Sequence, residues 1–113
     1  RVRYLGLPGD PGHALACRQM HDFGTIVTVD VKGGTEAGSR FSEALELFSI
    51  AASLGSTESL VVPPALERSK GFTAEQKAWS DVGTGTVRLS IGLEDVGDLI
   101  DDLDKALDAA KYD

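Results

Sequence analysis

The sequence predicts an α+β domain, with one antiparallel sheet and helices packed on one face of that sheet. Two hydrophobic patterns lead to this expectation. Residues 23–31 and 86–91 alternate apolar and polar side chains, which is typical of half-buried strands. Residues 35–48 and 96–110 carry apolar side chains at helical spacing, which is typical of helices with one buried face. A chain of 113 residues is long enough for one such domain and too short for two.

The first half of the chain is predicted to form a helix, a strand and a second helix. Residues 11–22 suit a helix because Asp10 can cap it, and Cys17 would lie among apolar neighbours there as a buried thiol. In the strand over residues 23–31, the face expected on the core carries Phe23, Thr25, Val27, Val29 and Val31. In the helix over residues 35–48, the buried stripe is expected to be Phe41, Ala44, Leu45 and Phe48.

The middle of the chain contains shorter elements. Residues 49–54 and 59–62 are predicted to be two short strands. The small, polar stretch 53–59 is either a hairpin turn with a capping glutamate or a loop that brings the backbone close to a ligand. Residues 73–79 are predicted to form a short capped helix. Residues 83–85 (Gly-Thr-Gly) are expected to form a turn rather than a phosphate loop, because a strand follows them and not a helix.

The last strand and helix have the clearest patterns. In the strand over residues 86–91, alternation separates an inward face (Val87, Leu89, Ile91) from a second face (Thr86, Arg88, Ser90). In the helix over residues 96–110, the apolar stripe under an acidic face consists of Val96, Leu99, Ile100, Leu103 and Leu107. The polar face of the sheet is then expected to meet either water or another domain.

Charge and composition exclude several classes of function. The net charge is −7, and residues 92–113 hold eight acidic side chains against two lysines. Such a segment repels phosphate backbones and no basic patch interleaved with aromatics occurs elsewhere, so nucleic acid is not expected as a partner. No apolar run approaches the roughly 20 residues of a membrane span, and no signal peptide is apparent. The single cysteine fits a reducing compartment, so a cytoplasmic location is expected.

Self-contained catalytic motifs do not occur in the sequence. His13 and His21 lie eight residues apart without further ligands nearby, so they are expected to be surface or helix-end histidines, and no metal is expected. No phosphate loop, dinucleotide-binding fingerprint or nucleophile elbow follows a strand. The residues alone therefore indicate an α+β domain with no catalytic apparatus of its own.

Arg88 is the main candidate for a binding residue, because it lies in the middle of a predicted strand with Thr86 and Ser90 on the same face. A guanidinium presents its donors in a fixed fork that fits a carboxylate or a phosphate. The alternative is a cross-strand ion pair on a hydrated sheet face. The pattern by itself leaves both interpretations open.

Several separated motifs, in order, resemble one known family. Residues 52–60 (ASLGSTESL) and 87–95 (VRLSIGLED) look like the C-terminal domain of the trans-sulfuration enzymes, the pyridoxal-phosphate-dependent family of Cys/Met metabolism. That family includes cystathionine γ-synthase, cystathionine γ-lyase, methionine γ-lyase and the O-acylhomoserine sulfhydrylases. Shorter similarities support the resemblance: residues 2–8 (VRYLGLP), His13, residues 18–20 (RQM), 23–24 (FG), 32–34 (KGG) and 47–49 (LFS).

The resemblance implies a fold and a set of site residues. Residues 1–113 would be the small, substrate-binding C-terminal domain of a fold-type-I enzyme that uses pyridoxal 5'-phosphate as cofactor. Arg88 falls on the arginine that binds the substrate α-carboxylate. Ser53, followed by Leu54, falls on the serine of the S-L-G motif, which lies close to both cofactor and substrate. The substrate would be a sulfur-containing or O-acylated amino acid, and the full-length enzyme would be a homotetramer.

The departures from the family pattern carry further expectations. None of the five lysines lies in the serine-threonine-lysine motif that forms the family's Schiff base. The large cofactor-binding domain is therefore expected to be absent from this chain, which would hold no catalytic residue and be inactive alone. Residues 61–66 also lack the family's usual histidine, which puts loop contacts near the substrate in doubt.

Substrate class and the alternative function rest on two observations. Ala52 stands where cystathionine-specific members often carry glutamate, which favours a methionine γ-lyase-like or sulfhydrylase-like substrate. The missing lysine motif supports the alternative, a non-catalytic, free-standing binding or interaction module derived from this fold.

Overall fold

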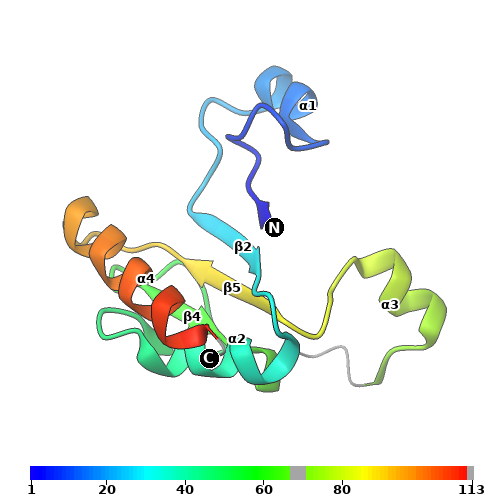
Figure 1. The fold of residues 1–113 in the computed structure, drawn as a ribbon. Coiled ribbons are helices and arrows are strands. Elements are labelled where there is room, and N and C mark those ends of the chain that lie inside the picture. The colour runs from blue at the N-terminus through cyan, green and yellow to red at the C-terminus, as the bar shows by residue number, and fades with distance from the viewer. Residues whose placement is uncertain (67–70, 112–113) are drawn as a thin grey trace.

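The computed structural model describes residues 1–66 and 71–111, which form a five-stranded sheet with helices (Figure 1). The elements in chain order are β1 (Val2–Arg3), α1 (His13–Gln19), β2 (Ile26–Asp30), α2 (Gly34–Ala44), β3 (Ser49–Ile50), β4 (Leu60–Val62), the 3-10 helix η1 (Pro64–Leu66), α3 (Ala74–Ser80), β5 (Thr86–Ser90) and α4 (Val96–Ala110). The predicted α+β class is therefore confirmed. No helix within the described ranges is long and apolar enough to cross a membrane.

The strand order is β1-β2-β5-β4-β3, so β5 lies at the centre of the sheet. Both neighbours of β5 pair with it in antiparallel register, and Arg88 lies opposite Thr28 on β2 and Val62 on β4. Among the described strands, β3 alone pairs in parallel, with β4, so the sheet is mostly rather than wholly antiparallel. Because β3 and β4 run in the same direction, residues 51–59 form a crossover loop, and the hairpin interpretation of this stretch is wrong.

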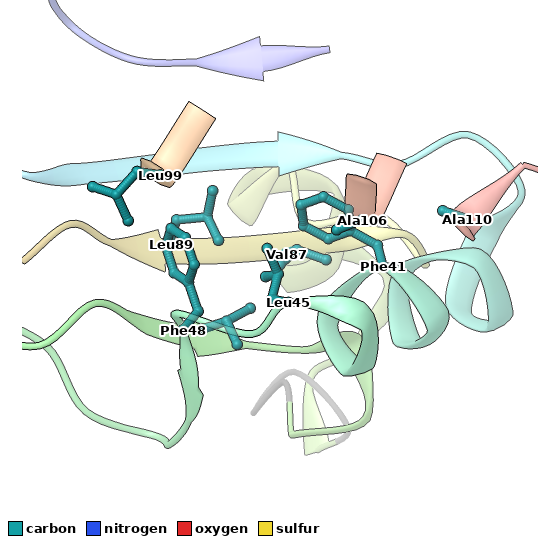
Figure 2. Packing of buried hydrophobic residues seen from close by; sticks show 9 residues of the cluster. Phe41, Leu45, Phe48, Val87, Leu89, Leu99, Ala106 and Ala110 are labelled. Atoms are coloured by element: carbon teal, nitrogen blue, oxygen red, sulfur yellow. The ribbon is translucent and has the colours of Figure 1, made fainter. Parts of the chain in front are cut away.

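One face of the sheet is covered by α2 and α4, as predicted, and this layer holds the core (Figures 1 and 2). Phe41, Leu45 and Phe48 pack there with Val87 and Leu89 from β5. From α4, the core receives Leu99, Ala106 and Ala110. Val27, Val29 and Val31 are partly buried against the same cluster, so these members of the predicted inward face are confirmed. Phe23 and Thr25 were wrongly included in that face, because β2 begins only at Ile26, Thr25 is exposed and the ring of Phe23 lies against His13. By contrast, α1 and α3 project away from the sheet (Figure 1).

The second helix ends four residues earlier than predicted, because a side chain from α4 intercepts the backbone after it. Asp102 is buried, and its two carboxylate oxygens accept hydrogen bonds from the backbone N–H groups of Glu46 and Leu47, each at 2.9 Å. Leu45 and Phe48 still reach the core, but from an extended segment rather than from a helix. A tertiary contact thus overrides the helical pattern.

The bounds predicted for α4 are confirmed, but the predicted stripe is only partly correct. Leu99 is buried, whereas Val96, Ile100 and Leu107 are 71%, 54% and 46% exposed. The buried face instead includes Asp102, Ala106 and Ala110. Small side chains allow α4 to pack closely, and Asp102 has to face inward to reach its two backbone partners. The start of the helix follows the sequence: Asp95 accepts hydrogen bonds from Gly97 and Asp98 N–H.

Two further differences concern α1. The helix begins only at His13, because Asp10 organises a turn before it and accepts a hydrogen bond from Gly12 N–H at 2.9 Å. Cys17 is exposed rather than buried, so its prediction as a core thiol is wrong. Its Sγ lies 3.4 Å from Nε2 of His13, whose Nδ1 is 2.6 Å from the carbonyl oxygen of Leu5. Because α1 projects from the sheet, apolar side chains on this helix have little core to pack against.

Candidate functional site

The face of the sheet that α2 and α4 leave uncovered carries a cavity of about 420 Å³. Strand alternation and register determine which side chains reach it, since Thr28, Val62 and Arg88 are cross-strand partners and share one face. The cavity is lined by strand residues (Thr28, Val62, Thr86, Arg88), by residues of the crossover loop (Ala52, Ser53, Leu54) and by Leu66 and Val82. The structure thus brings together the three residues singled out from the sequence, Ser53, Leu54 and Arg88.

Arg88 reaches across the cavity to the crossover loop. Its Nη2 donates a hydrogen bond to the carbonyl oxygen of Ser53 at 3.0 Å. Its Nε is buried and has no hydrogen-bond partner among the described residues. Neither residue opposite Arg88 is acidic, and Arg88 takes part in none of the ion pairs found within residues 1–66 and 71–111. The cross-strand ion pair is therefore not formed, and donor capacity remains at the cavity.

The crossover loop is held by hydrogen bonds, since residues 52–58 are exposed. Gly55 N–H donates to Oγ of Ser90 at 2.9 Å. Farther along, the backbone N–H and the hydroxyl of Ser59 both donate to the carboxylate of Glu94, at 2.9 and 2.8 Å. The backbone N–H of Ser59 is the main reason that the pKa of Glu94 lies below its ordinary value. The loop therefore brings its backbone to the cavity, as one of the two sequence interpretations expected.

A charged cluster adjoins the cavity at Thr86, where β1, β2 and β5 meet. The carboxylate of Asp30 accepts hydrogen bonds from Thr86 Oγ1 at 2.6 Å and from Arg3 Nη2 at 2.7 Å. Arg1 also pairs with Asp30, and both arginines pair with Asp81. Burial raises the pKa of Asp30, but the Thr86 hydrogen bond and the arginine charges outweigh burial and hold the pKa below its ordinary value. Sequence reasoning missed this cluster because β1 was not predicted.

Other contributors to the site could be found from the sequence only in part. Ser90 was placed on the face of Arg88 by alternation alone, but its bond to Gly55 depends on the path of the loop. Thr28 and Val62 line the cavity because strand register places them beside Arg88. Leu66 and Val82 line it because the connecting segments pack there. None of these four has a local sequence signal for a binding role.

Cofactor and metal capacity is limited within the described residues. No lysine among residues 1–66 and 71–111 lines the cavity, so the described residues do not supply there the amine that would hold pyridoxal phosphate. Lys32 and Lys111 line a second cavity near the end of α4, while Lys77 and Lys105 belong to α3 and α4. Lys70 lies outside the described residues. No group of three or more histidine, cysteine or acidic side chains in the described part could hold a metal ion.

The fold and the cavity define an α+β domain with an arginine-lined cavity on the open face of its sheet. The model of one family, described as Cys/Met metabolism PLP-dependent enzyme, matches residues 1–108, so the chain belongs to this family. The resemblance inferred from the motifs is confirmed.

Relatives and solved structures agree with this assignment. The chain is 46% identical to an L-methionine gamma-lyase of Pseudomonas deceptionensis over 96% of its own length and 27% of that protein. It is 40% identical to an O-succinylhomoserine sulfhydrylase of Pseudomonas aeruginosa, again over 96% and 27%. The crystal structure of a cystathionine gamma synthase from Xanthomonas oryzae in complex with cystathionine superimposes with a TM-score of 0.87 at 41% identity, covering 97% of this chain and 28% of that one. The chain thus spans about a quarter of the length of the relatives it matches.

Proposed function

We propose that residues 1–113 act as the C-terminal, substrate-binding domain of a pyridoxal-phosphate-dependent enzyme that cleaves or replaces a substituent on a sulfur-containing or O-acylated amino acid. The observation that carries this proposal is Arg88, which lines the cavity and takes part in no ion pair among residues 1–66 and 71–111. Family membership and the match over only 27% of the relatives support the role of one domain in a larger polypeptide.

Arg88 would bind the α-carboxylate of the substrate. A guanidinium that lines a cavity without an acidic partner is suited to a ligand that brings carboxylate oxygens to it. The Ser53 carbonyl occupies one donor of the guanidinium and thereby fixes the orientation of its plane. A carboxylate held by two parallel bonds is then fixed in orientation as well as in place, which aligns the substrate for reaction.

Ser53 and Leu54 would form the part of the pocket next to the cofactor and the substrate side chain. Ser53 is exposed at the cavity, and Leu54 presents an apolar side chain that is 59% exposed. Ala52, also in the lining, is short and apolar. The short, apolar Ala52 and the 46% identity to an L-methionine gamma-lyase support a methionine γ-lyase-like or sulfhydrylase-like substrate over a cystathionine-specific one.

The cofactor would be held mainly outside this chain, because none of the described residues that line the cavity is a lysine. Pyridoxal phosphate, when bound, supplies an electron sink for the carbanions that form on the amino acid. This chain would bind the carboxylate, orient the substrate and close the active site, and would be inactive by itself. The complete enzyme is proposed to be a cytoplasmic homotetramer, as in the family.

A second candidate, a free-standing binding module without catalysis, is supported by the lack of the family's serine-threonine-lysine motif in the sequence. Both candidates use Arg88 as an anion-binding group. They differ in whether the complete polypeptide turns over an amino acid.

The test compares Arg88→Ala with the wild type in the complete polypeptide that includes this chain, with L-methionine as the substrate probe. Loss of two charge-assisted hydrogen bonds of about 1.5–3 kcal/mol each is expected to lower kcat/KM by about 10²- to 10⁴-fold. Arg40→Ala is the matched control, because Arg40 pairs with Glu36 on α2, on the other side of the sheet. An unchanged kcat/KM in Arg88→Ala would contradict the proposal, and absence of turnover in the wild type would favour the non-catalytic module.

A further inference from the structure

We propose that Ser90 is a positioning residue for the carboxylate site, holding the crossover loop so that the Ser53 carbonyl stays on the guanidinium of Arg88. This inference rests on the proposed function of Arg88 and adds a residue to it. Ser90 acts through Gly55 and is assigned no direct contact with the substrate.

Two neighbouring hydrogen bonds connect the crossover loop with β5. Arg88 Nη2 donates to the carbonyl oxygen of Ser53 at 3.0 Å, and Gly55 N–H donates to Oγ of Ser90 at 2.9 Å. On each segment, the two bonded residues are two positions apart. A shift of the loop that breaks one bond therefore displaces the other, so the acceptor on Arg88 depends on the anchor at Ser90.

The two ends of the connection differ in their surroundings. Ser90 lies in the central strand and is 1% exposed, so its end of the hydrogen bond is held in a fixed position. Gly55, at the other end of the bond, is exposed. Its φ of 77° is a conformation that glycine adopts without a side-chain penalty. Since little of the loop is buried, hydrogen bonds rather than packing define its path near the cavity.

The far end of the loop is anchored separately. Ser59 donates to Glu94 through both its N–H and its hydroxyl, and its Oγ accepts from Gly92 N–H at 2.8 Å. Leu93 N–H donates to the carbonyl of Thr57 at 2.8 Å. These anchors would keep the loop attached when the hydroxyl of Ser90 is removed. Apart from the Arg88 bond itself, the bond at Ser90 joins β5 to the described part of the loop closest to Ser53, so its loss should change the local position of that carbonyl.

The experiment uses Ser90→Ala in the complete polypeptide, with Ser42→Ala as a matched control. Ser42 is also 1% exposed, and its Oγ donates to the carbonyl of Gly38 at 2.8 Å inside α2, away from the cavity. Both variants delete one oxygen from an equally buried serine. We expect Ser90→Ala to raise KM for L-methionine about five- to tenfold, the effect of roughly one hydrogen bond, with little change in kcat. Ser42→Ala should leave KM unchanged.

A second readout follows the hydrogen bond directly. In the 113-residue chain, the amide of Gly55 should exchange slowly with solvent in the wild type and in Ser42→Ala, and faster in Ser90→Ala. If Ser90→Ala does not fold, Ser90→Cys keeps a side chain of the same shape but replaces the acceptor oxygen by a weak sulfur acceptor, and it should raise KM in the same direction.

The outcomes separate this inference from the proposal on which it rests. If Arg88→Ala raises KM but Ser90→Ala behaves like Ser42→Ala, the positioning role is overturned while the carboxylate site stands. An equal rise of KM in both serine variants also overturns it, because the effect then reflects general stability. If Arg88→Ala itself changes nothing, the proposed function fails first.

Discussion

The buried carboxylate of Asp102 should contribute substantially to the stability of the domain. It joins α4 to the segment that follows α2, by accepting the backbone N–H groups of Glu46 and Leu47 at 2.9 Å each. Asp102 is 5% exposed, so few water molecules can replace its oxygens. Asp102→Ala would leave two partly buried N–H donors without an acceptor.

The size of the effect follows from these two bonds. An unsatisfied donor costs about 1–3 kcal/mol, and both sites are partly buried, so we expect Asp102→Ala to lower the free energy of unfolding by about 2–4 kcal/mol. The total free energy of unfolding of a domain of this size is about 5–15 kcal/mol. The melting temperature of Asp102→Ala should therefore fall by roughly 10–20 °C. Asp102→Asn keeps one acceptor oxygen and should show about half of the loss.

Urea unfolding of the 113-residue chain, followed by far-UV circular dichroism, measures this difference. Asp101→Ala is the matched control, because it removes the neighbouring carboxylate from the exposed face of the same helix. Its free energy of unfolding should stay within about 0.5 kcal/mol of the wild type. If Asp102→Ala and Asp101→Ala are equally stable, the two hydrogen bonds of Asp102 do not stabilise the domain, and the reasoning is refuted.

Two further predictions concern the surroundings of the cavity. Gly92→Ala should destabilise the chain and displace the crossover loop, because a Cβ would lie 2.4 Å from the carbonyl oxygen of Thr57. Gly9→Ala is the control, because a Cβ there meets nothing within 4 Å. Equal urea midpoints of the two variants would contradict the prediction. The lowered pKa of Asp30 means that its stabilisation is present above its unfolded pKa of about 3.9 and is lost as the pH falls through the folded value. Thr86→Val removes a hydrogen bond that lowers this pKa, so the loss of unfolding free energy between pH 5 and pH 2 (roughly the titration range) should be smaller than in the wild type, and an equal loss would count against the assignment.

The candidate site was predictable to the extent that it depends on local pattern and on motifs. Alternation in residues 86–91 placed Arg88 on the face opposite the core, and the structure has it there. The motif containing Ser53 and Leu54 pointed to the same cavity. The bond between Arg88 and the Ser53 carbonyl was not predictable, because it joins residues 35 positions apart through a loop whose direction depends on the parallel pairing of β3 and β4.

The sequence by itself determined the elements whose signals are local. The capping box of Thr73 and Gln76 starts α3, Asp95 caps α4, and alternation defines β5. These signals act within a few residues, so they do not depend on how distant parts of the chain pack.

Only the tertiary structure decided the features that need partners far along the chain. Asp102 ends α2 from 55 and 56 residues away, and it turns α4 so that Val96 and Ile100 face outward. Asp30 gains its arginine partners only because β1 adds to the sheet edge. The physical reason is the same in each case: a hydrogen bond or ion pair is worth little until packing of the core has placed its two ends together, and no local pattern encodes that placement.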